Sequence, residues 1–409
     1  MSFIPNHISV LQKKSPYQLQ NLLNSSVIEL DDIHYREFLE LTSCNDINTK
    51  KSELVTFLKE QDFIIDSNYV YDSTQNLVEF TNGILHLTIM PTEKCNFRCV
   101  YCYEKFKNGR MANNIIAGLK KMIYDIIVHQ EIHTVHISWF GGEPTLEPDI
   151  IILINNYVKS LIKNKDIKFY STMTTNGYLL NIDLFSKLFK NGVSNYQITI
   201  DGTKHDKMRL LADGSPTRDV ILSNIKEMLK TNFDFELFIR HNVLDEDVDK
   251  EWYDFLKNNI IKDDKRVSLE LSPVVKLGGA NDKNLNTITT DNDQKMKLHT
   301  NYPLSCGIPI IEQVTNAPIS GVCKAAYRYG YVIRSSGIIS KCTICLDYKN
   351  NEIGKIIDAN FYFINKELEK KWIDSNLEKE CLTCRSYVSC LNRCCPYRKM
   401  LYNTKIWCI

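Results

Sequence analysis

The feature that most constrains the fold is a long alternation of strand-like and helix-like segments between residues 84 and 275. Short apolar runs alternate with segments whose apolar residues recur every three or four positions. This alternation is typical of parallel β–α units, because parallel strands need a long crossover connection. The predicted strands are 84–90, 134–140, 168–174, 196–200, 235–243 and 267–275, and the predicted helices are 113–128, 148–163, 182–191, 220–231 and 248–258. About six units fit, so we predict an α/β fold with a partial (β/α)6 TIM-type barrel.

Two regions of different character flank this alternation. The first 84 residues read as a small α+β unit with a winged-helix-like order, and residues after about 300 are rich in cysteines and turns. In the first region the predicted elements are a strand at 26–30, helices at 33–41 and 51–60, and a hairpin of 63–65 with 69–71. The last region shows helical periodicity only near 363–372, so we expect bound metal to stabilise it. We therefore predict domains at 1–84, 85–300 and 301–409.

Charge and hydropathy exclude several classes of partner. Lys and Arg total 50 and Asp and Glu total 49, so no basic excess points to nucleic acid. The sequence has no uninterrupted apolar stretch of about 18 residues, so it predicts no membrane span. The start of the chain lacks the pattern of a signal peptide, so we expect a cytoplasmic protein.

The 14 cysteines are many for a reducing compartment, where disulfides rarely persist and cysteine clusters more often bind metal. Three of them, Cys95, Cys99 and Cys102, have the spacing C-x3-C-x2-C directly after the first predicted strand of the barrel. Three thiolates on one loop can bind three irons of a cubane cluster and leave the fourth iron open to a small molecule. Structural zinc would prefer four ligands, and His133 and His136 are distant in sequence.

This spacing, with the aromatic Tyr101 before the third cysteine, resembles the signature of the radical S-adenosylmethionine (SAM) superfamily. The resemblance implies that Cys95, Cys99 and Cys102 hold a catalytic [4Fe–4S] cluster, whose open iron binds the methionine amino and carboxylate groups. It places Tyr101 near the adenine. It also implies reductive cleavage of S-adenosyl-L-methionine to a 5′-deoxyadenosyl radical, which abstracts a hydrogen from the substrate.

A second motif, Gly141-Gly142-Glu143-Pro144, follows the predicted strand 134–140. Glycines let the backbone approach a ligand closely, and Glu143 can accept a hydrogen bond from an ammonium group. The superfamily carries a similar GGEP segment that contacts the methionine amine. The resemblance therefore assigns these four residues to the cofactor site.

A third motif resembles the SIDG…HD..R stretch of the peptide- and protein-modifying branch of the superfamily. It consists of Thr199-Ile200-Asp201-Gly202, then His205, Asp206 and Arg209, with Thr in place of the more usual Ser and a shorter loop. The resemblance implies that Thr199 and Arg209 contact the ribose or the methionine carboxylate, which suits the two parallel donors of Arg. For His205 and Asp206 a capped surface turn is the alternative. The further candidates are Asn176, in a Thr-Asn-Gly turn, and Arg240 and Asn242, at a strand end.

The C-terminal cysteines resemble the seven-cysteine SPASM domain, which carries auxiliary iron–sulfur clusters. By that resemblance auxiliary cluster I takes Cys323, Cys342 and Cys394, and auxiliary cluster II takes Cys381, Cys384, Cys390 and Cys408. The enzyme would then hold three [4Fe–4S] clusters. The alternative is a zinc ribbon.

Cluster I has only three ligands in this assignment. Either Cys306 supplies the fourth, or an open iron remains that binds a substrate thiolate. Cys345 and Cys395 are additional, and for each we favour a buried small hydrophobe over a ligand.

These resemblances favour a maturase of ribosomally made peptides that installs a thioether or carbon–carbon cross-link. Residues 1–84 would bind the leader of a precursor peptide by strand addition, and a flavodoxin or ferredoxin would supply electrons. For residues 1–84 the alternative is a packing extension of the barrel. The alternative is an anaerobic sulfatase-maturing enzyme that forms formylglycine from Cys or Ser. A non-catalytic electron carrier or zinc-binding interaction protein is disfavoured, because neither needs the GGEP segment.

Overall fold

The computed structural model describes residues 2–3, 8–12, 15–21, 27–42, 47, 50–66, 83–244, 247–262, 264–274, 276–277, 280–285, 292–310 and 323–373. The chain divides into two compact units. One consists of residues 1–79, 313–326 and 371–409, and the other of residues 80–312 and 327–370. In the described part of the chain, no helix is long and apolar enough to cross a membrane.

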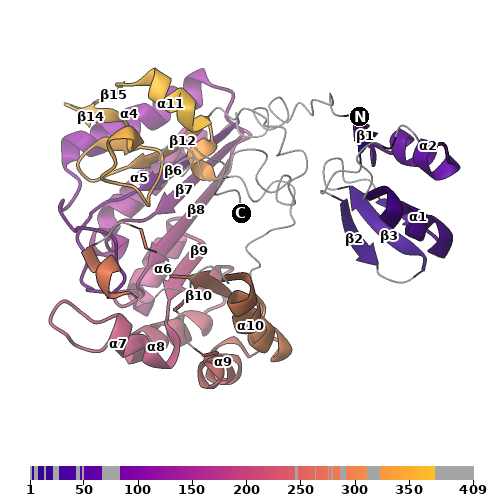
Figure 1. Ribbon diagram of the computed structural model, residues 1–409. Helices are drawn as coiled ribbons and strands as arrows, with labels where there is room; N and C mark the ends of the chain where they lie inside the picture. Colours follow the sequence, from indigo (N-terminus) through magenta and orange to yellow (C-terminus); the bar gives the residue numbers. More distant parts are fainter. Residues whose placement is uncertain are drawn as a thin grey trace. The chain divides into compact units, whose positions relative to one another are not determined.

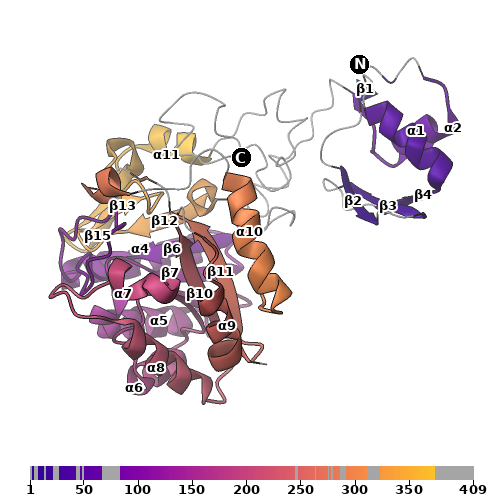
Figure 2. The same ribbon diagram turned by 60° about the horizontal axis from the view of Figure 1, so that its bottom comes forward.

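The larger unit is built on a parallel sheet whose six strands stand in chain order (Figures 1 and 2). These strands are β6 (Ile84–Ile89), β7 (Thr134–Trp139), β8 (Lys168–Thr175), β9 (Asn195–Thr199), β10 (Glu236–Val243) and β11 (Val267–Pro273). The connecting helices are α4 (Asn113–His129), α5 (Pro148–Ile162), α6 (Ile182–Lys190), α8 (Arg218–Leu229) and α9 (Lys250–Leu256), the last continued by a π-helical turn at Lys257–Ile261. The predicted partial barrel of six β–α units is thus confirmed.

Alternation along the strands separates two faces of this sheet. In β7, Val135, Ile137 and Trp139 are fully buried, whereas His136 and Ser138 face the other side and are partly exposed. Two of the connecting helices start at a side-chain cap: Asn181 accepts a hydrogen bond from Leu184 N at 3.0 Å, and Asp249 accepts one from Trp252 N at 3.1 Å. Apolar residues therefore fill the layer between sheet and helices, and polar residues line the opposite, concave face.

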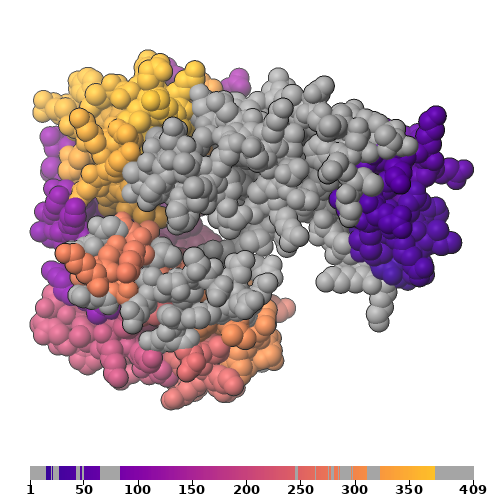
Figure 3. All heavy atoms as spheres, viewed as in Figure 1, coloured from indigo at the N-terminus to yellow at the C-terminus, as the bar shows by residue number. Residues whose placement is uncertain are grey.

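Four further strands extend the sheet beyond β6, in a region where we predicted none. They are β12 (Tyr329–Ile333), which is parallel to β6, and then antiparallel β13 (Ile338–Ser340), β14 (Glu352–Ile357) and β15 (Asn360–Phe363). Helix α4 packs against them so closely that a Cβ on Gly118 would come within 2.3 Å of Ile356. Figure 3 shows the atoms of β14 and β15 as part of one yellow-orange surface.

Shorter elements complete the described chain. The helices are α7 (His205–Met208), α10 (Asn292–Ser305) and α11 (Lys366–Ile373), and the 3-10 turns are Pro144–Leu146, Gly202–Lys204, Ala280–Asn284, Lys324–Ala326 and Lys349–Asn351. Helix α11 matches the periodicity predicted near 363–372.

The N-terminal unit has a hydrophobic core of its own. Strands β2 (Ile8–Gln12), β3 (Tyr17–Asn21) and β4 (Val27–Leu30) form an antiparallel sheet, followed by α1 (Asp32–Thr42) and α2 (Glu53–Glu60). The core consists of Leu19, Ile28, Leu30, Phe38, Leu41, Ile47, Leu54, Val55, Leu58, Phe63 and Ile64.

The predictions for this unit are partly met. The strand at 26–30 and both helices are present, whereas β2 and β3 were not predicted. The segment predicted as a hairpin contributes β5 (Ile65–Asp66), which pairs with β1 (Ser2–Phe3). Its expected partner, 69–71, lies outside the described residues.

Candidate functional site

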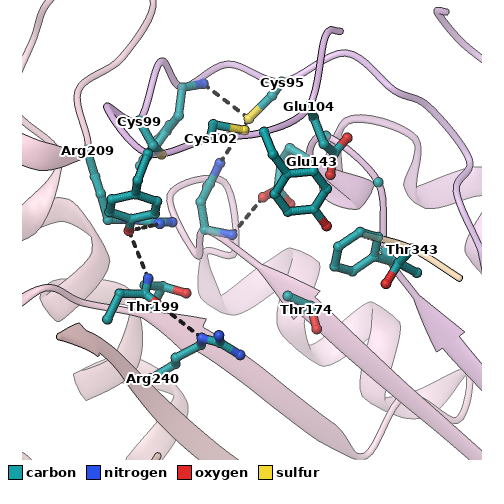
Figure 4. A pocket seen from close by; sticks show the side chains of 18 of the residues that line it. Cys95, Cys99, Cys102, Glu104, Glu143, Thr174, Thr199, Arg209, Arg240 and Thr343 are labelled. Carbon is teal, nitrogen blue, oxygen red and sulfur yellow. Dashed lines mark hydrogen bonds between the residues drawn. The ribbon is translucent and has the colours of Figure 1, made fainter. Parts of the chain in front are cut away.

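A cavity of about 460 Å³ opens at the carboxyl ends of the parallel strands, the end at which α/β barrels carry their active sites. Of the residues predicted from sequence, it is lined by Cys95, Cys99, Tyr101, Cys102, Gly141, Gly142, Glu143, Asn176, Thr199, Arg209, Arg240 and Asn242. Pro144 does not line it but starts the buried turn behind Glu143. Figure 4 shows the three cysteines on one side and Thr174, Thr199 and Arg240 on the other.

The cysteine loop leaves β6 and is fixed to the segment that follows β9. Arg98 N donates to Leu210 O at 2.8 Å, and Val100 N donates to Met208 O at 2.9 Å. Within the loop, Phe97 N donates to Cys95 Sγ at 3.3 Å. Residues more than 100 positions apart therefore hold the loop over the cavity.

The three thiols favour their neutral form. Burial raises the pKa of Cys95 and Cys102 to about 12, and burial also raises the pKa of Cys99. Thiolates at this position need a strong positive charge nearby, which bound iron supplies. Within the described residues, no three His, Cys, Asp or Glu side chains are placed to hold a single metal ion. A cubane cluster instead takes one thiolate per iron.

The two glycines of the GGEP turn make the closest backbone contacts of the site. Gly141 has a φ of +121°, and a Cβ on Gly142 would lie 2.3 Å from Lys94 O. Glu143 N donates to the same oxygen at 3.0 Å. The glycines admit the segment leading into Cys95, and that they also admit a ligand stays a prediction.

The Glu143 carboxylate is fully buried and accepts four hydrogen bonds. Oε1 accepts from Thr145 N (3.0 Å), Thr145 Oγ1 (2.6 Å) and Thr175 Oγ1 (2.6 Å), and Oε2 accepts from Asn176 N (2.7 Å). Burial raises the pKa of Glu143, and these donors oppose that shift. Oε2, with one protein donor, keeps acceptor capacity for a cationic ligand group.

Tyr101 is the centre of a buried polar hub. Its hydroxyl donates to Asp201 Oδ2 and accepts from Arg209 Nη1 and Asn242 Nδ2, both at 2.8 Å. Burial raises the pKa of Tyr101 well above its usual value, so the hydroxyl stays a neutral donor. The hydroxyl bridges a carboxylate and a guanidinium, and Tyr101 lines the cavity; its position beside an adenine stays a prediction.

A second polar network covers the cavity floor. Arg240 Nη1 donates to Glu270 Oε1 at 3.1 Å, Nη2 to Ser272 Oγ at 2.6 Å, and Nε to Asn242 Oδ1 at 2.9 Å. Gln197 donates to the other oxygen of Glu270 and accepts from Thr174 Oγ1 at 3.2 Å. Arg240 is thus already neutralised by a carboxylate.

His205 and Asp206 have structural roles. His205 is fully buried; its Nδ1 accepts from Asp201 N at 3.1 Å and its Nε2 lies 3.0 Å from Thr217 Oγ1. Asp206 Oδ1 accepts from Thr217 N (2.7 Å) and Arg218 N (3.0 Å), at the start of α8. The surface-turn alternative is therefore wrong for His205. Its ring fixes the backbone of Asp201, which belongs to the hub around Tyr101.

Two observations test whether the site fits S-adenosylmethionine and a cluster. Arg209 Nε is buried and has no hydrogen-bond partner among the described residues, in a cavity that three thiols line. A carboxylate satisfies such a donor, and iron satisfies such thiols. The residues fit: the cysteines would hold the cluster, and Arg209, Glu143 and Asn176 would bind polar groups of the methionine. When bound, the pair supplies one-electron cleavage of a carbon–sulfur bond.

The C-terminal cysteines are only partly described. Cys381, Cys384, Cys390, Cys394, Cys395 and Cys408 lie outside the described residues, and Cys323 belongs to the other compact unit. The Cys306 thiol donates to Asp254 Oδ1 of α9 at 3.7 Å, whereas the Cys342 thiol contacts Cys345. The structure therefore brings Cys306 to a carboxylate and not to Cys342.

Sequence reasoning missed several residues of the cavity. Thr174, Gln197 and Ser272 line it from β8, β9 and β11, and Tyr103 and Glu104 line it just after Cys102. The period-two alternation of the predicted strands is a signal for Thr174, Gln197 and Ser272, because it places them on the face of the sheet that points away from the helices. Asp201 stood inside a recognised motif, but its bond to Tyr101 depends on the tertiary fold.

Comparison with known proteins identifies the domain. Residues 89–258 match the model of the Radical SAM superfamily. GTP 3′,8-cyclases are similar in sequence: that of Clostridium perfringens is 30% identical over 173 residues, and that of Campylobacter jejuni is 30% identical over 162 residues. These matches cover 42% and 39% of this chain and 50% and 48% of the relatives, so the chain spans about half the length of the curated relatives it matches. The chain therefore carries a radical SAM domain.

Two solved structures share the fold. AnSMEcpe with bound AdoMet and the Cp18Cys peptide has a TM-score of 0.54 at 17% identity, covering 75% of this chain and 88% of that chain. SuiB of Streptococcus suis bound to the precursor peptide SuiA has a TM-score of 0.52 at 17% identity, covering 98% of this chain and 97% of that chain. This confirms the predicted α/β radical SAM fold.

Proposed function

We propose that this protein is a radical SAM peptide maturase. It would abstract a hydrogen from a ribosomally made precursor peptide and install a thioether or carbon–carbon cross-link. The observation that carries the proposal is the extent of the likeness to SuiB, which covers 98% of this chain and was solved with a precursor peptide bound. The likeness to GTP 3′,8-cyclase, at 42% of the chain, is accounted for by the common domain alone.

The N-terminal unit supports a peptide substrate. Its three-stranded sheet ends on β4, whose residues alternate between exposed and buried, and Val27 is 50% exposed. An edge strand with free backbone groups binds an extended peptide by strand addition, and alternate side chains then give selectivity. We propose that residues 1–84 bind the leader of the precursor in this way.

The arrangement of polar groups in the cavity supports hydrogen abstraction. Its polar groups come from the carboxyl ends of successive strands, and the hubs at Tyr101 and Arg240 fix their orientation. Fixed donors bind the cofactor in one geometry, which decides which substrate hydrogen lies within reach. We further propose that the chain holds two auxiliary clusters and receives electrons from a flavodoxin or ferredoxin.

The test uses short peptides encoded beside the gene. With the reconstituted enzyme, S-adenosylmethionine and a reductant, a maturase removes two hydrogens per cross-link and leaves no carbonyl, which mass spectrometry and an aldehyde probe detect. Cys99→Ala should abolish release of 5′-deoxyadenosine, and persistent release would refute the radical assignment.

Deletion of residues 1–79 separates cleavage of S-adenosylmethionine from recognition of the precursor peptide. The variant should cleave S-adenosylmethionine without substrate but lose binding and processing of the precursor. Labelling by the aldehyde probe, together with full processing by the deletion variant, would instead support the formylglycine-forming alternative. The observation that favours formylglycine formation is the likeness to anSMEcpe, which has a TM-score of 0.54 and was solved with a bound peptide.

A further inference from the structure

Cys342 and Cys345 form a pair on one tight loop beside the cavity. The loop follows β13 (Ile338–Ser340), and the two residues between the cysteines, Thr343 and Ile344, line the cavity. Figure 4 shows Thr343 at its wall. We had interpreted Cys345 as a buried small hydrophobe. The hydrogen bonds around the pair point to a different role.

Polar groups of the loop converge on the sulfur of Cys342. Its thiol accepts hydrogen bonds from the backbone N–H groups of Ile344 and Cys345 and from the Cys345 thiol. N–H groups directed at a sulfur are the outer contacts that orient a metal-bound sulfur. Apolar packing of Cys345, which is 6% exposed, would need none of these contacts.

Asn351 holds the loop in this shape. Its Oδ1 accepts from Lys341 N (3.0 Å) and Cys342 N (2.9 Å), and its Nδ2 donates to Cys342 O (2.8 Å) and Cys345 O (3.0 Å). The side chain is fully buried and uses its complete hydrogen-bonding capacity on the backbone of one short segment. Both cysteines are therefore preorganised by the same residue.

Charged groups join this loop to the segments before Cys95 and after Cys102. Arg334 donates to Leu346 O and to both oxygens of Glu93, each at 2.9 Å, and Lys105 pairs with Asp347 at 2.7 Å. The thiol pair thus has a fixed position on the wall of the radical SAM cavity.

We propose that Cys342 and Cys345 together ligate an iron–sulfur cluster at this wall, so that Cys345 is a ligand and not a filler of the core. The spacing C-x2-C is the chelating spacing of iron–sulfur and zinc sites, and both sulfurs here lie on one preorganised turn. The assignment removes the need for Cys306, which lies against Asp254. It rests on the proposed auxiliary-cluster content of the chain, and not on the identity of the substrate.

The test measures iron and sulfide in the anaerobically reconstituted full-length protein. Cys345→Ala and Cys342→Ala should each lose up to about four irons per chain, and the double variant should lose no more than either, because both thiols serve one cluster. Cys345→Ser keeps the size of the side chain; it should keep part of the iron but shift the Mössbauer and EPR spectra. Cys306→Ala is the matched control and should keep the wild-type content.

Release of 5′-deoxyadenosine is read in parallel, because it reports the cluster at Cys95, Cys99 and Cys102. It should persist in every variant, which shows that the radical SAM unit has folded. Wild-type iron, sulfide and spectra in both Cys345 variants would overturn the proposal. Zinc in place of iron at the pair, or a Cys342–Cys345 disulfide in the reconstituted protein, would overturn it as well. Failure of peptide processing would count against the proposed function only.

Discussion

Replacing Tyr101 by Phe removes one oxygen atom from the centre of the buried hub. That oxygen bridges the carboxylate of Asp201 and the guanidinium of Arg209, and it also accepts from Asn242 Nδ2. Asp201 and Arg209 are 5% and 8% exposed, so water replaces the lost contacts only in part. We expect the carboxyl ends of β9 and β10 to become less stable.

The magnitude follows from the three hydrogen bonds. A hydrogen bond to a charged group contributes about 1.5 kcal/mol or more, and a neutral one about 1 kcal/mol. Asp201 keeps the bond from Asn242 N at 3.1 Å, which lowers the net cost. The sum is a loss of about 3–4 kcal/mol in the free energy of local opening, or two to three orders of magnitude in the opening constant.

Hydrogen–deuterium exchange with mass spectrometry measures this quantity for peptides that cover β9, β10 and residues 205–211. Tyr178→Phe is the matched control, because the Tyr178 hydroxyl has no hydrogen bond to the described residues while its ring packs on Phe97. The control should change the opening free energy by less than about 0.5 kcal/mol. The reasoning would be refuted if Tyr101→Phe stayed within the same limit.

Three further predictions concern the walls of the site. Arg334→Ala leaves the buried Glu93 without its ion-pair partner and with only the hydrogen bond from Asn108 Nδ2, so it should cost about 3 kcal/mol in urea unfolding, and Glu93→Gln in the same chain should recover part of that loss. Gly142→Ala places a Cβ 2.3 Å from Lys94 O, so it should lower the iron content at the cysteine loop, whereas Gly109→Ala, where a Cβ meets open space, should not. Burial lowers the pKa of His205 to about 4, below the ordinary value of about 6.5. The folded state therefore favours the neutral imidazole, and its stability is complete above pH 6.5. As the pH falls towards 4, protonation of His205 in the unfolded state should lower the free energy of unfolding by up to about 3 kcal/mol. Unfolding at pH 7 and pH 5 should show this loss in the wild type and a smaller loss in His205→Gln.

The order of strands and helices in the barrel was predictable because each element carries its own periodicity. All six predicted strands and all five predicted helices between residues 84 and 275 are present, with ends shifted by a few residues. The strands β12 to β15 were missed, because short strands among turns and cysteines have too few residues to show a period. The same limit applies to β2 and β3 of the N-terminal unit.

By itself, the sequence determined the radical SAM domain, because the three cysteines and the GGEP turn are local patterns that iron and S-adenosylmethionine require. Tertiary structure alone decided what each motif residue contacts. Glu143 is held by donors from Thr145, Thr175 and Asn176, and Tyr101 meets Asp201 across 100 positions of chain. The loop of Cys342 and Cys345 depends in the same way on Asn351. Hydrogen bonds between distant segments form only once packing brings the strands together, so residue types and spacing do not contain them.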